Sequence, residues 1–127
     1  MDDAVRFIEY KGKKVLLIEL MQGGRLPRPS PAEQIKELAK LFLDSVTREP
    51  HGSILLLADF TGAQLDKKAV EILKPILVLD RPYLKRSAWV GTENIPKTLY
   101  EHLKSFSRRD LPTFKTRKEA FEWLVSD

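Results

Sequence analysis

The carboxylates Asp59 and Asp66 are the residues of this sequence best placed for chemistry. Asp59 ends an unbroken apolar run, Ile54–Ala58, and Asp66 stands at the start of a predicted helix. Two carboxylates on one loop could support acid–base catalysis if burial raised the pKa of one of them. The alternative, which we favour, is structural: both side chains accept hydrogen bonds from turn amides, and Asp66 caps the helix.

A second polar loop, Gly91–Asn94, follows the next predicted strand. In α/β sheets, ligands usually bind beyond the carboxyl ends of the strands, so the two loops are expected to converge if their strands are neighbours. The predicted residues for binding a partner or ligand are Asp59, Thr61, Gln64, Asp66, Lys67, Lys68, Thr92, Glu93 and Asn94.

Other chemistries find little support in the residue types. The chain has no cysteine, and therefore no disulfide, thiolate nucleophile or zinc–sulfur site. His51 and His102 stand apart from any second metal ligand at a usual spacing. The glycines lack a phosphate-binding pattern, and no serine stands in a nucleophile elbow. We therefore predict a non-enzymatic protein with no cofactor, no metal and no catalytic residue.

The net positive charge of the chain comes entirely from its second half. Residues 1–63 hold 9 basic and 9 acidic side chains, whereas residues 64–127 hold 13 and 9. Aromatic residues are not interleaved with the basic ones, so no specific nucleic-acid partner is expected. The start of the sequence lacks a secretory signal pattern, and no apolar run approaches the ~20 residues of a membrane span. These features predict a cytoplasmic protein without a membrane span.

The first part of the chain reads as two strands and a helix. Residues 4–10 and 14–20 predict a hairpin, with the more apolar second strand further inside the sheet. The first strand, at the edge, leaves open pairing with a second copy as a homodimer. Residues 21–30 are either a plain connection or a mobile loop near a site. Ser30–Glu33 forms a capping box for a helix that should end near Arg48.

Strands and helices then alternate to the end of the chain. Pro75 lies inside the helix that follows Asp66 and is expected to kink or divide it. The remaining predicted elements are a strand over 85–91, a helix capped by Asn94, an edge strand over 111–115 and a helix after Thr116. This order predicts one α/β domain over residues 1–127. Its single-layer mixed sheet has four to five strands, an antiparallel N-terminal hairpin, parallel later strands and about four helices.

Residues 53–124 resemble the SpoIIAA-like branch of the STAS superfamily. The resemblance rests on three stretches in order: Leu57-Ala-Asp-Phe-Thr-Gly62, Arg81-Pro-Tyr-Leu-Lys-Arg-Ser-Ala-Trp-Val-Gly91 and Phe114-Lys-Thr-Arg-Lys-Glu-Ala-Phe-Glu-Trp-Leu124. It implies a small α/β module of bacterial regulation that binds a protein partner, classically a kinase that is also an anti-sigma factor.

Classical members of that family are switched by phosphorylation of a serine or threonine at the start of the helix after the first motif. Here Asp66-Lys67-Lys68 occupies that place, so the usual phosphoacceptor is missing. The resemblance therefore implies a non-catalytic regulatory or protein-interaction module whose partner, a kinase or a sensor, is not specified. The alternative is an α/β domain that binds a small apolar, lipid-like ligand.

Overall fold

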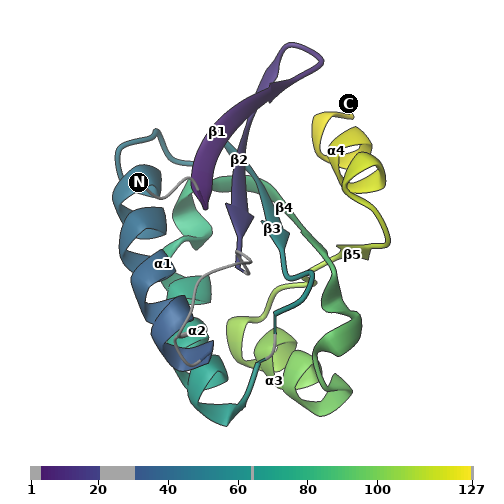
Figure 1. Ribbon diagram of the computed structural model, residues 1–127. Coiled ribbons are helices and arrows are strands. Elements are labelled where there is room, and N and C mark those ends of the chain that lie inside the picture. The colour runs from purple at the N-terminus through teal and green to yellow at the C-terminus, as the bar shows by residue number, and fades with distance from the viewer. Residues whose placement is uncertain (1–3, 21–30, 64, 127) are drawn as a thin grey trace.

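The protein is built on one five-stranded sheet whose strands follow each other in chain order (Figure 1). The computed structural model describes residues 4–20, 31–63 and 65–126. The strands are β1 (Val5–Tyr10), β2 (Lys13–Glu19), β3 (Ile54–Asp59), β4 (Leu84–Val90) and β5 (Thr113–Phe114). β1 pairs antiparallel with β2, and every later pairing is parallel. The predicted α/β class, hairpin and parallel strands are confirmed, with β1 and β5 at the edges.

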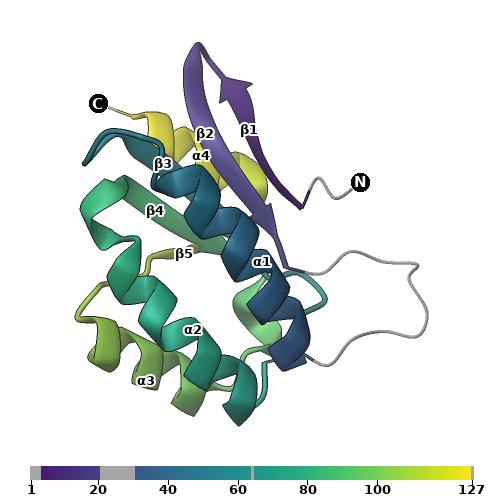
Figure 2. The same ribbon diagram turned by 90° about the vertical axis from the view of Figure 1, so that its left-hand side faces the viewer.

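Within the described residues, four helices cover the two faces of this sheet unequally. They are α1 (Pro31–Val46), α2 (Lys67–Leu79), α3 (Lys97–Ser107) and α4 (Arg117–Val125). Figure 2 shows α1, α2 and α3 on the near face of the sheet and α4 behind it. The first face therefore carries the larger apolar core, and α4 is the cover of the second face.

The neighbouring strands β2 and β3 present apolar side chains to both faces of the sheet, so helices can cover both faces. Successive side chains of a strand point to opposite faces. Leu16 and Ile18 therefore join the core beneath α1 and α2, whereas Val15 and Leu17 pack toward α4. Every residue of β3 is buried, as expected for the apolar run before Asp59.

One of the two expectations for Pro75 is wrong, and so is the predicted cap at Asn94. Pro75 does not divide its helix, because α2 runs from Lys67 to Leu79 with the proline inside it and packs through Leu73 and Ile76 on either side. Asn94 does not cap α3. It ends a short 3-10 helix, η2 (Thr92–Asn94), and α3 begins at Lys97 with Pro96 as its N-cap.

The proline explains the displaced start of α3. Ile95 precedes Pro96, and a residue before proline is driven out of the helical region into extended backbone. Ile95 has φ −86° and ψ 122°, so the helix cannot begin before the proline. The expectation for residues 21–30 falls outside the described residues. Among the helices that are described, none combines the length and apolarity needed to cross a bilayer.

Candidate functional site

The carboxyl ends of β2, β3 and β4 meet along one edge of the sheet, which we call the carboxyl edge. Glu19 at the end of β2 pairs in register with Asp59 at the end of β3, and Asp59 pairs with Val90 at the end of β4. The amide of Phe60 donates to the carbonyl of Val90 over 2.9 Å. The loops that leave β3 and β4 therefore start side by side, as the sequence predicted for neighbouring strands.

A glycine lets these two loops touch. Gly91 has φ +70°, a left-handed conformation that residues with a Cβ rarely adopt. A Cβ at this position would lie 2.6 Å from the Cα of Thr61, and closer still to the amide nitrogen and hydroxyl of Thr61. Gly91 thus permits a backbone contact that holds the Asp59–Lys68 loop against the Gly91–Asn94 loop.

Asp59 belongs to a chain of four charged side chains that crosses the carboxyl edge. Arg117, in the first turn of α4, donates from Nε to Oδ2 of Asp59 over 2.6 Å and from Nη2 to Oε2 of Glu19. Arg6 of β1 donates from Nη1 to Oε1 of Glu19 over 2.6 Å. The amide of Thr61 donates to the other oxygen of Asp59 over 2.9 Å. These ion pairs connect β1, β2, β3 and α4.

This network keeps the two carboxylates ionised. Burial by itself would raise the pKa of Asp59, but hydrogen bonds from Thr61 and Arg117 outweigh it and hold that pKa below its ordinary value. Hydrogen bonds from Arg6 and Arg117 lower the pKa of Glu19 in the same way. Acid–base catalysis near neutral pH needs a raised carboxyl pKa. The hydrogen bonds at Asp59 therefore favour the alternative that this side chain stabilises the loop.

We expect Arg117→Met to lower the free energy of unfolding by about 1–2 kcal/mol at pH 7, since it removes hydrogen bonds to two carboxylates but Arg117 is partly exposed to solvent. A carboxylate whose pKa is lowered by folding stabilises above its unfolded pKa, and this contribution is lost as the pH falls through the folded pKa. The variant should therefore lose less stability than the wild type on acidification below about pH 4.5. Urea denaturation from pH 3 to 7 measures both effects.

Lys118→Met is the matched control for this substitution, because Lys118 is exposed and adjacent in sequence. It should change stability by less than about 0.5 kcal/mol. Equal effects of the two variants would mean that the bridge from Arg117 contributes nothing to the fold.

The remaining candidate residues differ in what the structure shows of them. Asp66 caps α2, as predicted, since its Oδ1 accepts from the amide of Ala69 over 2.8 Å. Thr61, Lys67, Lys68 and Glu93 are exposed, and Thr92 is half-buried. Gln64 lies outside the described residues, and of Asn94 only the backbone position in η2 is described.

Lysines occupy helix starts that usually carry acids. A helix N-terminus bears a partial positive charge, so acidic side chains in the first turn stabilise it and basic ones oppose it. α1 has Glu33 in its first turn, and α4 has Glu119 there after Arg117 and Lys118. α2 and α3 have no acidic residue in the first turn, and begin with Lys67, Lys68 and Lys97 instead. The carboxyl edge therefore presents exposed positive charge that the fold itself does not require.

A second charged cluster lies away from the carboxyl edge and was not predicted. Asp80 follows α2, is 1% exposed and pairs through Oδ1 with Nη1 of Arg109 over 2.8 Å. Arg109 also donates to the carbonyl of Leu77 over 2.9 Å and to the hydroxyl of Ser87 over 2.9 Å. Although Arg109 opposes the shift, burial raises the pKa of Asp80 to about 6. Neither residue was among those predicted from the sequence to form a site.

Metal binding finds no support in the geometry. Across the described ranges, no group of three or more histidine, aspartate or glutamate side chains is placed to hold a metal ion.

Comparisons of the chain with protein-family models, with curated proteins and with solved structures found no match.

Proposed function

We propose that the protein is a non-catalytic regulatory module that binds a protein partner at its carboxyl edge, through the Asp59–Lys68 loop, the start of α2 and the Gly91–Asn94 loop. The observation that carries this proposal is the mutual contact of the two loops at Gly91 and Thr61. This contact brings the loop after β3 against the loop after β4, where Thr61 and Glu93 are exposed. The resemblance to SpoIIAA-like proteins is the reason for proposing a protein partner.

The state of the carboxylates supports binding over catalysis at this surface. Asp59 is engaged by Arg117 and by a turn amide, and Asp66 is engaged by the amide of Ala69. Both were the candidates for an acid or base. Their hydrogen bonds hold the loop and the helix start in place, which leaves Thr61, Lys67 and Lys68 as the exposed groups for contact with a partner.

Reversal of the charge at Lys67 and Lys68 should separate binding from folding. Glutamate in the first turn favours the helix dipole, so Lys67→Glu together with Lys68→Glu should leave stability unchanged or raise it by about 0.5–1 kcal/mol. Partner affinity should fall at least tenfold, because two cations that face the partner become anions. The measurement is capture from the native host, mass-spectrometric identification, and titration of the purified partner.

Lys36→Glu with Lys40→Glu on α1 is the matched control, since both lysines are exposed on another helix. It should retain the partner captured by the wild type. Equal affinity of the Lys67/Lys68 double variant and the wild type for the identified partner would rule out this surface.

A further inference from the structure

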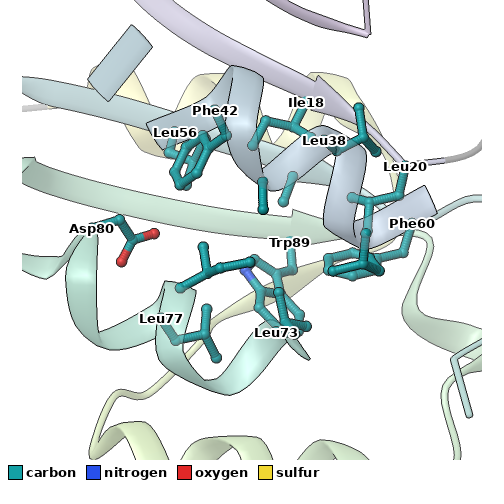
Figure 3. A pocket seen from close by; sticks show the side chains of 14 residues that line it. Ile18, Leu20, Leu38, Phe42, Leu56, Phe60, Leu73, Leu77, Asp80 and Trp89 are labelled. Carbon is teal, nitrogen blue, oxygen red and sulfur yellow. The ribbon is translucent and has the colours of Figure 1, made fainter. Parts of the chain in front are cut away.

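An apolar pocket lies between α1, α2 and strands β2–β4, and reaches Phe60 of the Asp59–Lys68 loop at one end (Figure 3). Among the residues that the structure describes, 14 line it, and Asp80 is the charged one of these. The cavity has a volume of about 50 Å³. For comparison, a cavity of about 150 Å³ holds a six-carbon aromatic ring, so this one has room for roughly two or three carbon atoms.

Alanines on opposite walls help to create the space. Ala39 lies on α1 and Ala58 on β3, and both line the pocket. Their neighbours along the same walls are large, for example Leu38 and Phe42 on α1 and Leu56 on β3. Close-packed cores normally leave few voids larger than a water molecule, so a pocket of this size stands out in a small protein.

The two ends of the pocket differ in polarity. Figure 3 shows Asp80 at one end and Phe60 with Leu20 at the other. The side chain of Asp80 is 2% exposed, and its Oδ1 is paired with Nη1 of Arg109 as already described. A ligand in this space would meet apolar walls along its length and a hydrogen-bond acceptor at one end.

We propose that this pocket binds a short linear alkyl alcohol, or the hydroxyl-bearing alkyl end of a larger uncharged molecule, with the hydroxyl donating to Asp80. The apolar walls favour an alkyl chain because its burial removes apolar surface from water. An anionic head is disfavoured beside a carboxylate, and an ionised group of either sign loses its hydration in an apolar pocket. Phe60 of the pocket belongs to the Asp59–Lys68 loop, but Thr61, Lys67 and Lys68 are not among the lining residues, so the two proposals are tested at different side chains.

The pocket supplies its own reporter. The chain has two tryptophans, and Trp89 lines the pocket whereas Trp123 lies on α4. In a Trp123→Phe background, Trp89 is therefore the only tryptophan. The probes are 1-alkanols from methanol to hexanol, together with 2-bromoethanol, whose bromine quenches tryptophan emission on contact. Backbone and methyl NMR shifts of the full chain locate the binding.

The proposal gives a definite pattern across the series. Affinity should rise about fourfold for each added methylene up to about three carbons, and then level off once the space is filled. Shifts should saturate and concentrate on Ala58, Phe60, Leu73 and Trp89. Propanoate should bind at least tenfold more weakly than 1-propanol at pH 8, where its carboxylate and that of Asp80 are both ionised.

Ala39→Leu tests the location, because its longer side chain fills the space from α1. It should abolish saturable binding, whereas Ala32→Leu, on the same helix and not among the lining residues, should leave it intact. Thermal unfolding of both variants verifies that they fold. Absence of saturable shifts in the wild type would identify the space as a packing void and overturn the proposal. Unchanged binding in Ala39→Leu, or equal binding of propanoate, would overturn the location or the role of Asp80.

Discussion

Arg109→Met is expected to be the most destabilising single substitution that we describe, lowering the free energy of unfolding by about 3–5 kcal/mol at pH 8. The guanidinium of Arg109 is the cation paired with Asp80, and the side chain of Asp80 is 2% exposed. Removing Arg109 leaves a buried carboxylate without its counter-charge, and it also frees the carbonyl of Leu77 at the end of α2. Urea or guanidinium denaturation measures the loss.

The loss should depend on pH in a defined direction. Folding raises the pKa of Asp80 from 3.8 to about 6, so the folded state binds this proton more tightly than the unfolded state. The contribution of Asp80 to stability therefore falls as the pH rises from about 4 to about 6. Without Arg109 the carboxyl is easier still to protonate, so the variant should be penalised more at pH 8 than at pH 5.

Arg108→Met is the control, because Arg108 is exposed and immediately precedes Arg109. It should cost less than about 1 kcal/mol at either pH. A similar loss in both variants, or a loss at Arg109 that does not change with pH, would contradict the assigned role of the buried pair.

Gly91→Ala is expected to cost about 3 kcal/mol. An alanine at φ +70° is strained by about 1–2 kcal/mol, and the collision of its Cβ with the backbone of Thr61 adds a comparable amount. Backbone atoms cannot rotate away as a flexible side chain can, so the two loops must move apart. The measurements are chemical denaturation and, for the partner surface, amide NMR shifts of the loop that contains Thr61.

Gly12→Ala provides the matched comparison. Gly12 has φ +80°, yet nothing lies within 4 Å of a Cβ built there. Gly12→Ala should lower the free energy of unfolding only by the conformational strain of the alanine, about 1 kcal/mol. It should leave the amide NMR shifts of the loop that contains Thr61 unchanged. Equal costs at the two positions would mean that the loops are not held together at Gly91.

Local patterns in the sequence were sufficient for the layout of the sheet. The unbroken apolar run of β3 and the glycine turn between β1 and β2 each act within a few residues, and the structure has the strands that they predict. The cap at Asp66 was found for the same reason, since a capping side chain and its amide are three residues apart. Asn94 was misjudged because Pro96, two positions later, overrides its capping preference.

The ion pairs could not be read from the sequence. Arg117 and Asp59 are 58 residues apart, and Arg109 and Asp80 are 29 apart, so no local pattern connects them. Basic residues at the end of a helix usually complement the dipole of that same helix. Arg109 instead bonds to the end of α2, which has no basic residue in its last turn. Only the packing of α3 against α2 brings these groups together.

The rings of Phe60 and Trp89, whose centroids are 4.5 Å apart, line the end of the apolar pocket nearest the carboxyl edge. Phe60 lies between Asp59 and Thr61, and Trp89 lies two residues before Gly91, so both loops of the partner surface adjoin a residue of the pocket wall or lie close to one in sequence. Thermodynamic linkage makes any such effect mutual. If an alcohol in the pocket changes the affinity for the partner by a given factor, the partner changes the affinity for the alcohol by that same factor.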